Sequence, residues 1–160
     1  MTVTRLTVPI ALVALAAGCA EPCLDASSAS VELGAQTGDA FTPFTPGAQV
    51  RLLSDPEGGL AVPYSARAQG IATDEPAGLE SRIQLADGSI TTWEADATLE
   101  CSQELDGGML WAQQLPFDAD PFANATDPLA GQTVRLTLTL SGQFRFASDS
   151  VELTLLPADD

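Results

Sequence analysis

Hydrophobic and polar residues alternate with a period of two along most of the chain after residue 30. Such alternation, interrupted by Gly, Pro, Asp and Ser, is typical of β-strands that have one buried face and one wet face. The first half of this region predicts strands at 30–34, 48–54 and 64–71. A loop at 41–47 separates the first two, because proline cannot donate to a strand ladder. A turn at 55–59 follows the second strand.

The pattern is clearer in the second half of the chain. The stretches 79–85 and 91–101 alternate on either side of Asp87-Gly88, a strong signal for a β-hairpin. The odd-numbered residues of 91–101, up to and including Cys101, are predicted to face inward. The remaining predicted elements are a turn at 106–108, a strand at 109–115, a long loop at 116–131, a strand at 133–140, and a last strand containing Val151, Leu153 and Leu155.

About eight short strands with one wet face each predict an all-β fold, an antiparallel sandwich of two sheets. Immunoglobulin-like and jelly-roll-like arrangements both fit this pattern. We expect a single sandwich domain over residues 30–160, preceded by a helical signal peptide. Trp93 and Trp111 are expected to pack in the core with the inward Leu, Val and Phe side chains.

The first 18 residues have the three-part pattern of a secretory signal. Residues 1–5 carry one positive charge, and residues 6–17 form an uncharged apolar run of twelve. This run is too short to span a membrane, which takes about 20 residues. Small residues follow at the expected cleavage point. An ordinary signal cut nearby, with Cys19 incidental, is the alternative interpretation.

The residues Ala16-Ala17-Gly18-Cys19 resemble the bacterial lipobox, Leu-(Ala/Ser)-(Gly/Ala)-Cys, with Ala16 in the place where Leu is usual. The resemblance implies that the Cys19 thiol receives diacylglycerol and that the signal, residues 1–18, is cut off before it. Residues 19–29 would then be the lipid anchor and a short tether. Ala20 stands where Asp commonly marks inner-membrane retention, so the resemblance implies the outer membrane of a Gram-negative cell envelope.

Composition excludes several function classes. The chain has no His and no Lys, which removes His-based triads, His metal ligands and Schiff-base lysines. Without the signal, five arginines minus 22 acidic residues give a net charge of −17. Nucleic-acid binding draws on Lys and Arg contacts with phosphate, so no nucleic-acid partner is expected. A solvated, self-repelling surface is the simplest interpretation of this charge.

Four short motifs resemble a loose set of uncharacterised lipoproteins from GC-rich Gram-negative bacteria of the myxobacterial kind. They cover about a third of the chain, with Glu57 and Leu60 departing from the usual residues. The resemblance implies an immunoglobulin-like exported domain and no particular activity. The motifs are Glu32-Leu33-Gly34, Phe41-Thr42-Pro43, Pro56-Glu57-Gly58-Gly59 and Arg67-Ala68-Gln69-Gly70.

Cys23 and Cys101 remain once Cys19 is assigned to lipid. Two thiols in an oxidising compartment predict one disulfide, and a pair of free structural thiols is the alternative. A nucleophilic cysteine would need a base such as His, which the chain lacks.

The loop at 117–127 is the best candidate for a metal site. Its hard oxygen donors suit Ca²⁺, but the EF-hand pattern fails because Ala123 replaces the glycine and no closing Glu follows. A solvated loop is the alternative, and no other cofactor is expected. The candidate calcium ligands are Asp118, Asp120, Asn124 and Asp127.

These features predict a non-catalytic interaction module held to a membrane by its N-terminal lipid, with an envelope protein or a glycan as its partner. Two alternatives remain open at this point. One is a calcium-stabilised adhesion or carbohydrate-binding domain. The other is a small hydrolase that uses a pair of carboxylates, which requires two carboxyl groups about 5–10 Å apart in a cleft.

Overall fold

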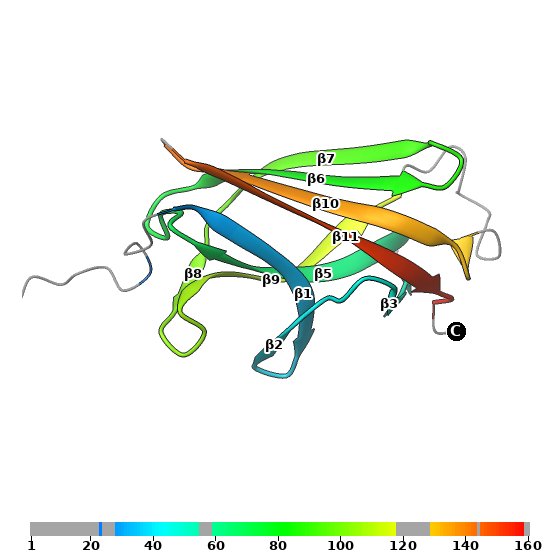
Figure 1. Ribbon diagram of the computed structural model, residues 1–160, viewed down its shortest axis with the longest axis horizontal. Helices are drawn as coiled ribbons and strands as arrows, with labels where there is room; N and C mark the ends of the chain where they lie inside the picture. The colour runs from blue at the N-terminus through cyan, green and yellow to red at the C-terminus, as the bar shows by residue number, and fades with distance from the viewer. Residues whose placement is uncertain (1–22, 24–27, 55–58, 118–128, 144, 159–160) are drawn as a thin grey trace, which may run out of the picture.

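Two β-sheets pack face to face in the computed structural model (Figure 1), which describes residues 23, 28–54, 59–117, 129–143 and 145–158. The predicted all-β, two-sheet sandwich is confirmed. The described residues form eleven strands rather than about eight.

The first sheet contains six strands and the second contains five. Across the first sheet the order is β2 (Ala40–Pro43), β1 (Ser30–Thr37), β5 (Leu60–Gln69), β9 (Gly107–Pro116) and β8 (Glu100–Ser102), and β4 (Leu53–Ser54) also pairs with β5. Across the second sheet the order is β3 (Ala48–Arg51), β11 (Phe146–Leu156), β10 (Thr133–Ser141), β6 (Ala77–Leu85) and β7 (Ile90–Ala97). All pairs are antiparallel except β3 and β11, which run parallel.

This strand order distinguishes between the two predicted arrangements. Strands β1, β5, β9 and β8 stand in the order A-B-E-D of an immunoglobulin-like sandwich, and β11, β10, β6 and β7 stand in the order G-F-C-C′ of its variable type. The chain also visits the strands in the matching sequence. The connectivity is therefore immunoglobulin-like rather than that of a jelly roll.

Apolar residues of both sheets meet in the space between them. The predicted inward faces of β6 and β10 are confirmed, because Leu79, Ser81, Ile83 and Leu85 are buried and so are Val134, Leu136, Leu138 and Leu140. Strand β10 lies between β11 and β6, and its register places Leu136 opposite Ile83 and Val151. The period-two pattern thus specifies which face of each central strand is covered.

Several predicted boundaries are wrong. The predicted loop at 41–47 begins as strand β2, which forms a hairpin with β1 through a two-residue turn at Gly38-Asp39. The predicted strand at 48–54 is two strands, because β3 pairs with β11 of the second sheet and β4 pairs with β5 of the first. Strand β5 starts four residues earlier than expected.

Some predicted core and loop residues lie elsewhere. Trp93 is half-buried and packs against the core, whereas Trp111 is half-buried and outside it, so its predicted core position is wrong. Phe146 is 77% exposed. Most of the predicted loop at 116–131 lies outside the described residues, but Phe117 and Leu129 at its two ends are buried.

One polar contact joins the two sheets inside the core. The Tyr64 hydroxyl on β5 and the Ser81 hydroxyl on β6 lie 2.5 Å apart, and both residues are buried. The pair matters because a buried hydroxyl without a partner costs about 1–3 kcal/mol. Burial raises the pKa of Tyr64 above its ordinary value of 10.0, although the bond to Ser81 opposes this rise.

Tyr64 is the only tyrosine, so its ionisation can be followed without interference from another phenol. Its pKa is higher in the folded state than in the unfolded state, so its contribution to stability is present below pH 10 and lost as pH rises through the folded-state value. We expect tyrosinate absorbance in native protein to appear only above the pH at which urea-unfolded protein titrates. Coincident titration curves for native and unfolded protein would contradict the buried position of Tyr64.

Candidate functional site

Several residues selected from the sequence lie outside the part of the chain that the structure describes. These are the lipidation residue Cys19, the candidate calcium ligands Asp118, Asp120, Asn124 and Asp127, and the turn residues 55–58. The structure brings together the other selected pair, Cys23 and Cys101, and it shows a groove that the sequence did not indicate.

Cys23 and Cys101 form a disulfide, as predicted. The S–S distance is 2.01 Å, and the Cα atoms are 5.9 Å apart, a separation within the ordinary range for such bonds. Cys23 is buried, and its sulfur lies 3.4 Å from the carbonyl oxygen of Gly107 at the start of β9. The bond therefore fastens the segment before β1 to the edge strand β8.

The predicted position of Cys101 is wrong in one respect. The sequence placed it on the inward face of the strand that carries Trp93, but that strand ends at Ala97 and the chain then crosses to the other sheet. Cys101 lies in β8 and is exposed. The alternation continues through Thr98 and Leu99 without a turn signal, so period alone could not show the crossing.

Removing this disulfide should lower the free energy of unfolding. The 78-residue separation corresponds to about 4–5 kcal/mol of loop-closure entropy in the unfolded chain. In the reduced native protein only the short segment from Cys23 to β1 is released. The entropy that this released segment gains in the native state offsets part of the entropy gained by the unfolded chain. The difference for loops of these two lengths gives about 2 kcal/mol as the smallest loss of unfolding free energy.

We expect urea unfolding of a Cys23→Ser/Cys101→Ser variant to show a loss of about 2–5 kcal/mol. The measurement uses protein starting at Ala20, so that lipid does not interfere. Alkylation of two cysteines in folded, unreduced parent protein would contradict the bond itself.

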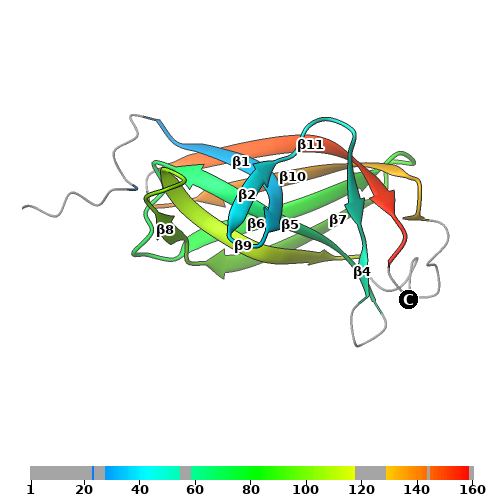
Figure 2. The same cartoon turned by 90° about the horizontal axis from the view of Figure 1, so that it is seen from below.

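A groove of about 510 Å³ opens along the side of the sandwich, where the second half of β1 parts from β5 and pairs with β2 alone. Strand β1 pairs with β5 at residues 65–69, and β4 pairs with it at residues 60–61. Between these pairings no described strand lies beside β5 on that side. Pro63 lies in this gap, where its missing N–H breaks no ladder bond. In Figure 2 the hairpin of β1 and β2 lies apart from β4.

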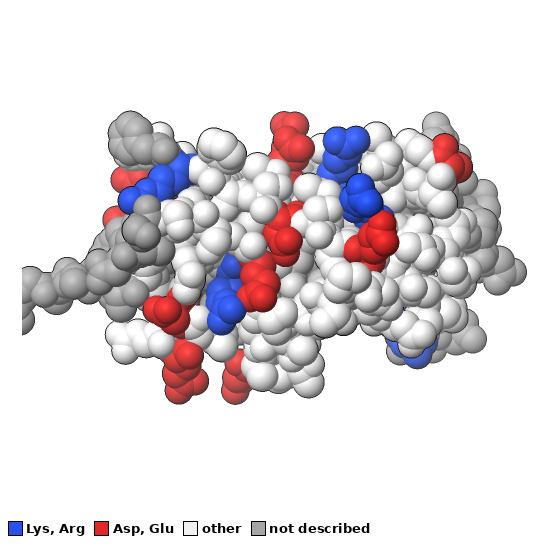
Figure 3. Space-filling view, viewed as in Figure 1, with Lys and Arg blue, Asp and Glu red and all other residues white. Residues whose placement is uncertain are grey.

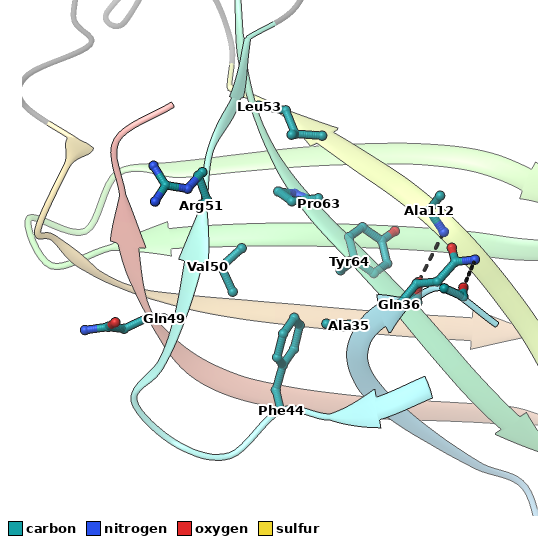
Figure 4. A pocket seen from close by; sticks show the side chains of 12 residues that line it. Ala35, Gln36, Phe44, Gln49, Val50, Arg51, Leu53, Pro63, Tyr64 and Ala112 are labelled. Carbon is teal, nitrogen blue, oxygen red and sulfur yellow. Dashed lines mark hydrogen bonds between the residues drawn. The ribbon is translucent and has the colours of Figure 1, made fainter. Parts of the chain in front are cut away.

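The groove has an apolar interior and a polar rim. Figure 4 shows Phe44, Val50, Ala35, Pro63 and Tyr64 arranged around the opening. Gln49 and Arg51 of β3 point away from it, and Gln36 at the rim donates its amide N–H to the carbonyl oxygen of Gly38 at 2.9 Å. Pockets of 300–1,000 Å³ with mostly apolar linings are usual for small ligands.

The floor of the groove contains an irregular backbone segment. A bulge shifts the register between β5 and β9 at Ser65, and Ala112 opposite has a φ of 49°. The Ala112 N–H donates to the Ser65 hydroxyl at 3.1 Å, which holds the bulge in place. A non-glycine residue in this region costs about 1–2 kcal/mol, and such conformations are concentrated at binding sites.

Replacing Ala112 with glycine should stabilise the protein by up to about 1 kcal/mol, because glycine adopts positive φ without a steric penalty. The N–H bond to Ser65 remains in this variant. Gln114→Gly is the matched control on the same strand. Since Gln114 does not have a positive φ, that change should lower stability by about 0.5–1 kcal/mol. Equal losses in the two variants, measured by urea unfolding, would contradict strain at Ala112.

The described surface carries both signs of charge despite the acidic total. Arg67 and Glu32 form an ion pair at 2.6 Å, and Arg67 also lies over the ring of Phe41, 5.7 Å from its centre. Arg135 and Glu152 form a second ion pair at 3.0 Å. In Figure 3 most of the basic groups lie beside acidic ones. This face is therefore not a uniform negative field.

A comparison of the chain with protein-family models finds no match, and a search of the curated proteins finds no similar sequence. Within the described ranges no three His, Cys, Asp or Glu side chains gather in a group that could hold a metal ion. The same ranges contain no helix of the length and apolarity needed to cross a membrane. Fold and geometry are thus the basis for a functional proposal.

Proposed function

We propose that this chain is a non-catalytic interaction module of the cell envelope, held to the outer membrane by lipid on Cys19, with its side groove as the binding site. The disulfide between Cys23 and Cys101 is the observation that supports the proposal most directly. It fastens the chain to the fold only four residues after the lipobox cysteine, so a lipid on Cys19 would hold the domain on a short tether.

The anchor determines how far the domain reaches. Three residues separate Cys19 from Cys23, so their Cα atoms are at most about 14 Å apart. One acyl chain binds a membrane only marginally, and two or three give a stable anchor. The domain stands close to the membrane, and a partner meets its sides and far end.

The groove lies in the half of the sandwich away from this attachment. Strand β5 runs from Leu60 to Gln69, and Gln69 donates to the Asp106 carbonyl oxygen near the disulfide. Pro63 and Tyr64 are therefore five or six residues, about 15–20 Å, from the anchored end. An apolar side chain of an envelope protein fits this lining better than a glycan, because the interior offers few hydrogen-bonding groups.

The chemistry of the groove also favours binding over catalysis. Tyr64 at its floor stays protonated, since burial raises its pKa, and its hydroxyl is occupied by Ser81. The chain contains no His and no Lys to serve as a base or a nucleophile. Recognition of an apolar group requires neither a base nor a nucleophile.

Lipidation is tested by the acyl mass of the mature protein. Expressed in a Gram-negative host, the wild type should be processed before Cys19, carry diacylglycerol and float with membranes. Cys19→Ser should lose the acyl mass. Cys23→Ser is the matched control and should keep the acyl mass, because only the lipobox thiol is modified. Retention of that mass in Cys19→Ser would overturn the proposal.

A further inference from the structure

The end of the sandwich that holds the disulfide also carries the most exposed large hydrophobic side chain among the described residues. Phe146 at the start of β11 is 77% exposed, compared with 46% for Ile90 and 38% for Leu53. A single exposed hydrophobic residue is ordinary on a protein surface. Phe146 is of interest because it lies at the same end of the domain as the segment that leads to Cys23.

Three segments converge at this end. The hairpin between β10 and β11 is closed by the Gly142 N–H, which donates to the carbonyl oxygen of Arg145 at 2.8 Å. The Arg145 guanidinium donates to the carbonyl oxygen of Gly70, in the connection between β5 and β6. A Cβ placed on Gly70 would lie 2.8 Å from the Ser28 carbonyl oxygen and 3.0 Å from the Arg145 guanidinium. The hairpin is thus held beside the segment that leads to Cys23, as Figure 1 and Figure 2 show.

We infer that the tip of the β10–β11 hairpin rests on the lipid surface of the anchoring membrane, with Phe146 inserted at the interface. This inference rests on the proposed lipid anchor. A Cys19–Cys23 span of at most about 14 Å holds this end of the domain near the bilayer. Phenylalanine on the apolar side of an interfacial element enters the boundary between head groups and acyl chains. The occupant is therefore the bilayer to which the chain is already attached.

Charge limits the contact to the hairpin tip. Exposed acidic residues occupy two neighbouring connections at the same end, Asp74 and Glu75 before β6 and Glu104 and Asp106 before β9. Figure 3 shows acidic groups at the end of the molecule where the N-terminal trace leaves. Anionic head groups would repel these connections, whereas a neutral bilayer surface admits Phe146 without that opposition. The domain is expected to touch the membrane at one corner rather than to lie flat.

The test measures how close two exposed positions lie to the bilayer. Full-length lipidated protein carrying Phe146→Trp is reconstituted in phosphatidylcholine vesicles with or without dibrominated acyl chains, which quench tryptophan on contact. Ile90→Trp is the matched control, because Ile90 lies at the opposite end of the same sheet. Ile90 pairs with Gln84 of β6, whereas Phe146 pairs with Ser141, which pairs with Gly78 of β6. The two rows are six residues, about 20 Å, apart along the sheet. Wild-type protein gives the background from Trp93 and Trp111.

We expect the tryptophan at position 146 to lose at least twice as large a fraction of its emission as the one at position 90. Both replaced side chains are exposed, so both variants should melt as the wild type does. Equal quenching in protein that floats with the vesicles would overturn the membrane contact and leave the anchor intact. Protein that fails to float would overturn the anchor, and the inference with it.

Discussion

The fold depends on the burial of two apolar sheet faces against each other. Each sheet has one apolar face and one more polar face. The apolar face of each sheet is removed from water only by packing against the other sheet. The central strands β5 and β10 each present a fully covered inward face to this core. The Tyr64–Ser81 contact places one polar bond within this core, between a strand of each sheet.

The sequence predicts the central strands well and the edges poorly. In β6 and β10 the alternation is complete, because one face is fully buried and the other is wet. Strands β2, β3 and β4 have two to four residues each, too few for a period to be visible. The Gly38-Asp39 dipeptide does signal the hairpin that joins β1 and β2. Nothing at Thr98 and Leu99 signals the crossing between sheets, since both residues continue the alternation.

Part of the candidate site could be predicted from the sequence and part could not. The disulfide followed from counting cysteines and from the expected compartment, which need no knowledge of strand order. The groove did not, because it exists only where β1 parts from β5 and β3 joins β11 on the other sheet. Which strands pair at this point depends on the arrangement of both sheets. Phe44, Val50, Pro63 and Ala112 come from different segments of the chain, and no local pattern indicates that they line one opening.

The disulfide also determines how the domain carries mechanical load. Under the proposed lipid anchor, a pull on a partner held at the far end would be resisted at the membrane through Cys23, and the covalent bond would pass that force to Cys101. The force therefore bypasses β1 and enters at β8, a three-residue strand that pairs only with β9. The Glu100–Met109, Cys101–Gly108 and Ser102–Gly107 pairs bear it first. The longer β1–β5 ladder, which forms one border of the groove, is thereby shielded from tension on the tether.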